Sequence, residues 1–391
     1  MVLFDWVIIG GGVHGCTVAS YLIKSGKTTA DKLRVIDPHH EPMFRWKRNT
    51  SLIGMEFLRS PSVHHLDMDP LSLHKYAKKM QEDRAFYGEY DRPSLDLFNN
   101  HCNDLLQQLN IFDSWHTGKV TKVEKNKGVW NVYTDASEII LGKNLVITIS
   151  INDQLNIPEW AVAAKGQTSI PMYHIFEEGL PNLKELKTPV IVVGGGITAA
   201  HLTINLSSIY PGDVILLKRH PFRVYPFDSD PGWLGPKNLS SFHKINDYEK
   251  RRNLIQQARH KGSIPRELNN SLKRLQRRQQ IHIVDGEVVS VGEDTDTFTV
   301  QLENKSKLKG GALLLATGFN PSRPGKGWLK ELIHKHQLKC AKCGYPIVNE
   351  SLEWCEHLYV SGALAELEIG PVSRNISGAR KAAERIISSI G

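Results

Sequence analysis

Two glycine-rich segments, far apart in the chain, constrain the fold more than any other feature. They read Gly10-Gly11-Gly12-Val13-His14-Gly15 and Gly194-Gly195-Gly196-Ile197-Thr198-Ala199. An apolar run of strand type precedes each segment, and a run of helical type follows it. A strand, a tight glycine turn and a helix form the first unit of a dinucleotide-binding fold. The chain is therefore predicted to be an α/β protein with two Rossmann-like dinucleotide-binding domains.

Each small residue of the first segment has its own physical role. Gly10 permits the tight turn, Gly12 lets the backbone approach a pyrophosphate, and Gly15 lets the helix pack closely on the strand. The next apolar run ends in Asp37, at the offset where an acid binds a ribose hydroxyl. We therefore expect a dinucleotide with an unphosphorylated ribose. The alternative is an ordinary turn between a strand and a helix.

The second segment leads to a different kind of strand end. Gly194, Gly196 and Ala199 take the three corresponding positions. The next strand, however, ends in Lys218-Arg219. An acid there would repel a 2′-phosphate, whereas two cations attract it. The second site is therefore predicted to prefer NADPH to NADH, with a basic, merely solvated loop as the alternative.

Length and composition set further limits. With 391 residues, the chain can form two or three domains, each with its own core. No leader precedes the first strand and no apolar run reaches membrane-spanning length, so we expect a cytoplasmic protein without a membrane partner. The cysteines number five, and this odd count favours reduced thiols over a disulfide framework.

The net charge of +8 is partly concentrated between residues 250 and 278, on a predicted pair of helices. Basic helix faces are commonly just solvated, and no aromatic or zinc motif accompanies this one, so a nucleic-acid partner is not expected. Attraction of NADPH or of an acidic substrate is a simpler use of the charge.

The order of strand and helix patterns predicts that one domain is inserted into the other. Residues 1–165 hold the first glycine segment followed by short alternating runs of strand type. Residues 166–309 hold the second glycine segment and the basic helices. Residues 310–391 then return to the first domain, so the nicotinamide domain interrupts it.

Glycines in the last segment are predicted to lie near a nucleotide. A buried strand ends in a small-residue turn at Gly318, where the chain is expected to cross between the domains. A further strand ends at Gly362. Gly370-Pro371 is expected to begin a helix whose amides can face an anionic ring.

Together, these motifs resemble those of the two-dinucleotide-binding-domain flavoproteins, and the resemblance covers essentially the whole chain. It implies that the first segment holds FAD and that the inserted domain holds the nicotinamide cofactor. By this resemblance, the glycines of the first segment and Asp37 would contact the adenosine half of FAD. Gly362 and the helix start at Gly370-Pro371 would lie near the flavin ring.

A local pattern is similar to one in flavin-dependent N-hydroxylating monooxygenases of the lysine and ornithine type. It consists of Phe44-Arg45-Trp46 followed by Met55-Glu56-Phe57-Leu58-Arg59, where those enzymes have Phe-x-Trp-His and then Met-Gln-x-Ser-Phe-Leu. There the segment runs beside the isoalloxazine, which implies that Trp46 contacts the flavin. Lys47 and Glu56 depart from the pattern, and the second run is shorter. The likeness therefore supports flavin contact better than it supports an amino-acid substrate.

The polar run that follows this pattern supplies the candidate catalytic residues. Arg59 could bind an anionic group, and His64 or His65 could assist proton transfer because histidine titrates near neutrality. Adjacent histidines point to different sides in most backbones, so we expect at most one to act and choose His64. A loop histidine that is satisfied by its neighbours is the alternative.

Four residues near the C-terminus have side chains that zinc accepts. Cys340 and Cys343 have the spacing of half a structural site, but Cys355 with His357 is not the usual second half. We favour a surface hairpin that carries reduced thiols and expect no metal.

The motifs favour an FAD-dependent, NADPH-consuming oxidoreductase. No Ser-His-Asp elbow, P-loop or HExxH motif is present, so the difficult chemistry must come from a cofactor. By the resemblance, a monooxygenase would add O2 to reduced flavin as a C4a-(hydro)peroxide and oxygenate a nucleophilic nitrogen or sulfur of a small molecule. A NAD(P)H:acceptor reductase without oxygen insertion and a flavin-binding sensor or partner protein are the alternatives. The lack of a cysteine pair beside the flavin favours the monooxygenase.

Overall fold

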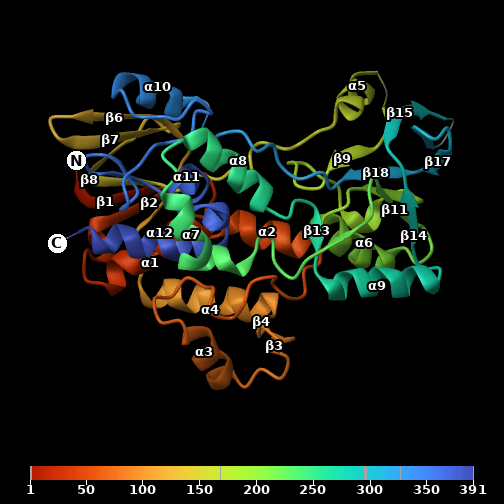
Figure 1. Ribbon diagram of the computed structural model, residues 1–391, viewed down its shortest axis with the longest axis horizontal. Helices are drawn as coiled ribbons and strands as arrows, with labels where there is room; N and C mark the ends of the chain where they lie inside the picture. The colour runs from red at the N-terminus through yellow and green to blue at the C-terminus, as the bar shows by residue number, and fades with distance from the viewer. Residues whose placement is uncertain (1, 168, 295–296, 326, 391) are drawn as a thin grey trace.

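The computed structural model, which describes residues 2–167, 169–294, 297–325 and 327–390, is arranged around two mainly parallel sheets (Figure 1). The first is centred on β1 (Leu3–Ile9), which pairs in parallel with β2 (Leu33–Asp37) and β8 (Ile139–Ile147). Its other strands are β5 (Trp115–Thr117), β6 (Val120–Asn126), β7 (Val129–Thr134), β19 (Glu353–Cys355) and β20 (Leu358–Val360). The order is β19-β20-β8-β1-β2-β5, with β7 joining β6 to β8.

The helices of the first and last segments cover this sheet together. The helix α1 (Val13–Lys24) packs beside α12 (Ile376–Ser388), so the two ends of the chain meet in one domain (Figure 1). Small, fully buried side chains at Ala379, Ala382 and Ala383 permit the close approach. The helix α10 (Trp328–Lys335) packs on β6.

The second sheet lies at the other end of the molecule (Figure 1). Its strands, in spatial order, are β14 (His282–Asp285), β11 (Val214–Lys218), β10 (Val190–Val193), β18 (Ala312–Leu315) and β9 (Met172–His174). Val190 and Val192 belong to one apolar cluster and Ile191 to another. This alternation is expected of a parallel strand covered on both faces, which explains the continuous apolar run in the sequence.

The second sheet is covered by helices on one face and by a small antiparallel sheet on the other. The helices α6 (Ile197–Ile209) and α9 (Arg266–Arg277) pack on each other. The antiparallel sheet consists of β15 (Val288–Glu293), β16 (Phe298–Leu302) and β17 (Lys307–Gly310), and α5 (Glu159–Gln167) packs on β15. The predicted α/β class with two Rossmann-type units is confirmed.

One strand lies in a different domain from the one predicted. The return to the first domain was expected from residue 310, but β18 pairs in parallel with β10 in the second sheet. The apolar run 312–315 would suit either sheet, because the sequence of a buried parallel strand does not indicate which strands lie beside it. The chain returns to the first domain only after this strand.

Further elements lie outside the two large sheets and the helices described so far. The remaining helices are α2 (Phe44–Leu52), α3 (Ser72–Met80), α4 (Leu95–Gln108), α7 (Pro236–His243), α8 (Tyr248–Ala258) and α11 (Glu366–Ile369). The remaining strands are β3 (Phe86–Tyr87), β4 (Arg92–Pro93), β12 (Arg223–Val224) and β13 (Ser263–Ile264). In the described part of the chain, none of the helices has both the length and the apolar composition that crossing a bilayer requires.

Candidate active site

One cleft connects the two glycine turns and has a volume of about 2800 Å³. Most of the predicted site residues line it, namely Gly10, Gly12, Asp37, Trp46, Arg59, His64, Gly194, Gly196, Lys218, Arg219, Gly318 and Gly362. Those that lie outside its lining are Gly15, Ala199, Gly370 and Pro371. Both predicted nucleotide sites therefore open onto the same space.

The first glycine turn leaves its backbone accessible at the N-terminus of α1. Gly10 has a φ of +103°, which side chains rarely permit. A side chain at Gly15 would lie 1.8 Å from the carbonyl oxygen of Gly10, so glycine is required where α1 crosses β1. Gly12 precedes α1 and has open space where a side chain would stand. This open cradle fits a pyrophosphate.

Asp37 ends β2 beside this turn. Its Oδ2 accepts a hydrogen bond from the amide of Gly11 at 2.7 Å, and its Oδ1 accepts one from the amide of His39 at 3.0 Å. An ionised carboxylate can accept about four hydrogen bonds. Capacity therefore remains for the hydroxyls of a ribose.

The C-terminal segment brings Gly362 against the same turn. Gly362 has a φ of +68°, and a side chain there would meet the ring of His14 at 3.5 Å. Nδ1 of His14 lies 2.9 Å from Oγ of Ser361. Burial lowers the pKa of His14 to about 4, so its ring is neutral near pH 7. Sequence reasoning missed His14, because its partners come from the opposite end of the chain.

Trp46 forms part of an apolar wall of the cleft. It lies on α2, and its Nε1 donates to Oδ1 of Asn99 at 3.0 Å. Its ring packs against Phe98 with 5.4 Å between ring centroids. Because these contacts hold the indole in one orientation, Trp46 can present a flat apolar surface to a ring in the cleft.

A helix begins at Pro371 as predicted, but it is not the long final helix. Pro371–Arg374 forms a short 3-10 helix, η5, and α12 begins at Ile376. A side chain at Gly370 would contact Leu239 of α7 at 3.5 Å, away from the cleft. Residues 375–377, at the start of α12, line the cleft instead. Proline suits the first turn of either helix type, so the sequence could not separate them.

The second glycine turn resembles the first. A side chain at Gly194 would lie 2.5 Å from the carbonyl oxygen of Ala316, at the end of neighbouring β18. Gly196 precedes α6 and lines the cleft. Ala199 is fully buried in α6, where its methyl group packs toward Gly194 rather than into the cleft.

The two cations that were predicted to bind a 2′-phosphate differ in their surroundings. The Lys218 side chain is 6% exposed and forms an ion pair with Asp285, at the end of β14. Its charge is therefore already neutralised, which differs from the prediction. The Arg219 side chain is 71% exposed and lies 3.9 Å from Glu287. Arg219 is the cation that remains accessible to a ligand.

Further basic residues that sequence reasoning missed line the cleft beside the second turn. They are His220, Arg223 and Lys261. A side chain at Gly195 would meet the ring of His220 at 3.3 Å, so this histidine lies over the turn. The basic pair at the end of β11 was one signal for this region, but Lys261 comes from a distant loop that only the fold brings here.

Arg59 lines the cleft and also bonds to other segments of the chain. Its Nη2 donates to the carbonyl of Tyr225 and to Oγ of Ser263, both at 2.9 Å, and its Nε donates to the carbonyl of Pro226 at 3.1 Å. These bonds tie the segment after Leu58 to the loop before α7 and to β13. Arg59 therefore acts as a clamp between segments, and its role in anion binding stays a prediction.

His64 and His65 face different surroundings, as adjacent residues were expected to. His64 lines the cleft, and burial, reinforced by the charge of Arg380, lowers its pKa to about 4. His65 is fully buried, and its Nδ1 accepts a hydrogen bond from the amide of Asp67 at 3.1 Å. Near pH 7 the ring of His64 is therefore neutral, and its catalytic role stays a prediction.

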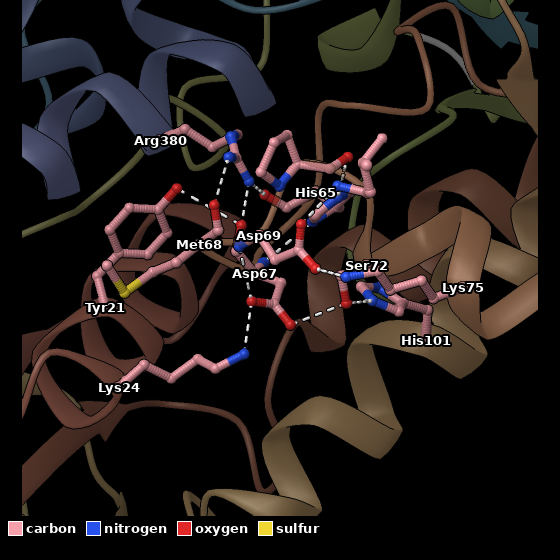
Figure 2. A network of polar contacts seen from close by, with 12 residues as sticks. Tyr21, Lys24, His65, Asp67, Met68, Asp69, Ser72, Lys75, His101 and Arg380 are labelled. Atoms are coloured by element: carbon pink, nitrogen blue, oxygen red, sulfur yellow. Dashed lines mark hydrogen bonds and ion pairs between the residues drawn. The ribbon is translucent and has the colours of Figure 1, made fainter.

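A buried polar network holds the segment that carries His64 (Figure 2). Arg380 of α12 donates to the carbonyls of His65, Asp67 and Met68. The carboxylate of Asp67 accepts from Nζ of Lys24 at 2.6 Å and from Oγ of Ser72 at 2.8 Å. The segment is thus fixed to α1 and α12, the two helices that flank the first glycine turn.

The thiols do not gather at the cleft. Among the described residues, no cysteine belongs to its lining. Cys16 is buried, and burial raises the pKa of its thiol to about 12, so it is unreactive. In the described ranges, Cys340, Cys343, Cys355 and His357 form no group of three potential metal ligands.

Comparison with solved structures shows the same fold over the full length. The ornithine hydroxylase of Pseudomonas aeruginosa matches with a TM-score of 0.77 and 18% identity, over 99% of this chain and 98% of that one. The cadaverine monooxygenase of Erwinia amylovora matches with a TM-score of 0.75 and 16% identity, over 100% and 95%. The bacillithiol disulfide reductase of Staphylococcus aureus matches with a TM-score of 0.63 and 17% identity, over 100% and 98%.

Comparison by sequence gives a family but no individual relative. No curated protein matches the chain. The family profile described as pyridine nucleotide-disulphide oxidoreductase matches residues 4–385, which includes both glycine turns and the returning C-terminal segment. The chain therefore belongs to the pyridine nucleotide-disulphide oxidoreductase family of FAD- and NAD(P)-binding enzymes.

Proposed function

We propose that this enzyme is an NADPH-oxidising flavin monooxygenase that acts on a small molecule with a nucleophilic nitrogen or sulfur. The main support for this proposal is that both glycine turns open onto one cleft. In the described part of the chain, the lining of this cleft contains no cysteine. A reductase of the dithiol type needs a thiol pair beside the flavin to receive electrons. Molecular oxygen is therefore the acceptor that best suits this cleft. The fold that the chain shares with an ornithine hydroxylase and a cadaverine monooxygenase supports the proposal.

FAD fits the first half of the cleft. Gly10 and Gly12 would hold its pyrophosphate at the start of α1, and Asp37 would bind its ribose. Gly362 and the first turn of α12 would bound the ring system. When bound there, FAD supplies the redox chemistry that no side chain provides.

The second half of the cleft fits NADPH. Gly194 and Gly196 would receive its pyrophosphate at the start of α6. Arg219, with Arg223 and Lys261 nearby, would attract the 2′-phosphate, because Lys218 is occupied by Asp285.

Protein groups would exclude water and manage protons around the substrate. Trp46 supplies an apolar wall, and the ring of His14 stays neutral beside the first glycine turn. His64 is neutral near pH 7 and lines the cleft, so its ring could accept a hydrogen bond from the substrate nucleophile. The clamp of Arg59 and the network of Arg380 hold His64 in place.

A rapid-mixing experiment tests this proposal. FAD-loaded protein is reduced anaerobically with NADPH, then mixed with oxygen while the flavin bands are followed. A transient phase whose spectrum differs from those of both reduced and oxidised flavin supports a monooxygenase and calls for a screen of amines and thiols. Direct reoxidation without such a phase contradicts it.

One observation favours a second candidate, a NAD(P)H:acceptor reductase. The chain shares its fold with a bacillithiol disulfide reductase. Steady NADPH oxidation that requires an added disulfide or quinone, with no oxygen-dependent transient, would favour the reductase. An absence of flavin reduction by NADPH would instead favour a flavin-binding sensor.

We further propose that the enzyme works in the cytoplasm with a small-molecule substrate and O2. All five cysteines are free in the structure, which suits a reducing compartment.

A further inference from the structure

A cluster of three largely buried arginines surrounds one glutamate at the wall of the cleft. Glu366 is fully buried, and its Oε2 accepts from Nη2 of Arg259 and from Nε of Arg374, both at 3.0 Å. Arg252 forms an ion pair with the same carboxylate and stacks over the ring of Tyr345 at 4.2 Å. All three arginines line the cleft.

The charges in this cluster do not balance. Three guanidinium groups share one carboxylate, and the hydroxyl of Tyr345 that accepts from Arg374 at 3.1 Å is neutral. Asp228 also interacts electrostatically with Arg259. Its Oδ1 accepts a hydrogen bond from the side-chain Nδ2 of Asn375 at 3.3 Å. Burial, and then the charges of Arg374 and Arg252, lowers the pKa of Arg259 to about 9. An excess of positive charge therefore faces the cleft.

Two of the arginines keep unused donors. Arg259 donates through Nε to the Pro371 carbonyl at 3.1 Å and through Nη2 to Glu366. Arg374 donates through Nε and Nη2 to Glu366 and Tyr345. Among the described residues, neither Nη1 group has an acceptor. Each guanidinium is therefore fixed by the protein while retaining a hydrogen-bond donor for a ligand.

The cluster lies between the two predicted nucleotide sites. Arg259 shares a turn with Gly262, whose Cα would lie 3.3 Å from a side chain at Gly196 of the second glycine turn. Arg374 ends η5, immediately before the turn of α12 that lines the flavin half of the cleft. A substrate must reach the flavin beside the nicotinamide site, so we take the cluster to border the place where a substrate would bind.

We propose that Arg259 and Arg374 form an anion-binding subsite that receives an acidic group of the substrate, with Arg252 and Glu366 holding the pair in position. The inference rests on the proposed function, because it assigns the ligand to that site. Both carboxylate and phosphate accept from guanidinium donors. Arg59, the anion-binding residue expected from the sequence, binds the carbonyls of Tyr225 and Pro226 and does not belong to this cluster.

The test is anion binding to the FAD-loaded protein, with sodium phosphate and sodium acetate as separate probes at constant ionic strength. Binding is followed by the change in the visible spectrum of the flavin. We expect saturable binding, weakened about tenfold or more by Arg259→Gln or Arg374→Gln, since each removes a charge-assisted hydrogen bond. Lys250→Gln, on the exposed part of α8, is the matched control and should bind as the wild type does. Tighter binding of acetate or of phosphate identifies the preferred group.

Several outcomes would overturn the proposal. Unchanged anion affinity in both variants would do so, and so would loss of bound FAD or weaker NADPH binding in place of weaker anion binding. If Arg374→Gln fails to fold, Arg259→Lys is the second variant, because it retains charge but loses the forked geometry. It should weaken binding less than Arg259→Gln does.

The test separates this subsite from the proposed activity, because anion binding requires no turnover. Loss of anion binding in the variants, together with direct flavin reoxidation in the wild type, would leave the subsite standing and reject the monooxygenase. An oxygen-dependent transient with unchanged anion affinity would reject the subsite alone.

Discussion

Gly12 and Gly15 belong to one motif, but glycine is needed at the two positions for different physical reasons. At Gly15 a side chain would collide with the backbone of Gly10, so the demand comes from the fold. At Gly12 a side chain would meet no protein atom within 4 Å, so the demand comes from the ligand that is to approach the turn. The two positions therefore offer a matched pair of substitutions.

The first prediction uses this pair. Gly15→Ala should lower the free energy of unfolding by about 1–3 kcal/mol, since it overpacks a rigid contact. Gly12→Ala should leave unfolding of the FAD-free protein unchanged but weaken FAD binding, because its methyl group faces the pyrophosphate. Denaturant unfolding and FAD titration measure the two effects. Equal loss of stability in both variants would contradict the separation.

The second prediction concerns Arg219, the accessible cation at the end of β11. Arg219→Ala should raise the KM for NADPH roughly tenfold, the effect of losing one charge-assisted hydrogen bond, and leave that for NADH nearly unchanged. Steady-state kinetics with both nucleotides measures this. Arg277→Ala, an exposed arginine of α9 outside the cleft lining, is the control. An equal effect on both nucleotides would show that Arg219 does not recognise the 2′-phosphate.

At the scale of elements, the segment 59–70 is held by its neighbours rather than by its own structure. Arg380 binds three of its carbonyls, and the ring of His65 packs edge-on against His101 of α4 at 5.0 Å. His101 in turn lies 2.8 Å from Oγ of Ser72. Both histidines are buried in the neutral form, which makes the anchoring of this segment sensitive to acid.

The third prediction is a loss of stability on acidification. Burial lowers the pKa of His65 to about 3 and that of His101 to about 4, below the value of about 6.5 in an unfolded chain. As the pH falls below about 6.5, the unfolded state binds protons first, so the free energy of unfolding decreases until the folded-state values are reached. His101 should account for about 1–2 kcal/mol of this loss at pH 5.

Urea unfolding at pH 7 and pH 5 measures that loss. His101→Gln should reduce the difference between the two pH values, because it removes one of the groups whose protonation favours unfolding. The exposed His334 provides the control, since His334→Gln should keep the full difference. A difference that stays the same in both variants would place the acid sensitivity elsewhere.

Across the molecule, the cleft lies between two domains that have distinct apolar clusters, with Met55 packing against both. One apolar cluster surrounds the first sheet, and two others cover the faces of the second. Polar contacts also join the two domains, among them the hydrogen bond of Arg59 with Ser263 and the ion pair of Arg92 with Glu267 of α9. Ligands that fill the cleft should therefore stabilise the molecule as a unit.

The fourth prediction follows from this linkage. Removal of FAD should lower the melting temperature, because a ligand at a hundred times its Kd stabilises the folded state by about 2.7 kcal/mol. Adding FAD back should restore it in the wild type and in Lys250→Gln, but much less in Gly12→Ala. Differential scanning calorimetry of apo and FAD-loaded protein measures the shift. Equal melting temperatures of the two forms would contradict an FAD site at the first turn.

The parts of the fold that were predictable were those with local signals. The apolar run of β1 and the glycine turn before α1 predicted the first domain, and the same pattern at β10 and α6 predicted the second. The location of β18 in the second sheet was not predictable, since a buried strand reads alike in either sheet. The type of the helix that begins at Pro371 was not predictable either, because proline suits the 3-10 helix η5 as well as an α-helix.

The α/β class, the two dinucleotide turns and the place of Asp37 after β2 could be predicted from the sequence, because they depend on residue types at short spacing along one strand, turn and helix. Which charges are free depends instead on the folded arrangement. Lys218 is neutralised by Asp285, Arg59 is bound by backbone carbonyls, and Arg259 and Arg374 share Glu366. The availability of a charge depends on which distant partners the fold places within a few ångströms. The spacing of residues along the chain does not indicate which partners these are.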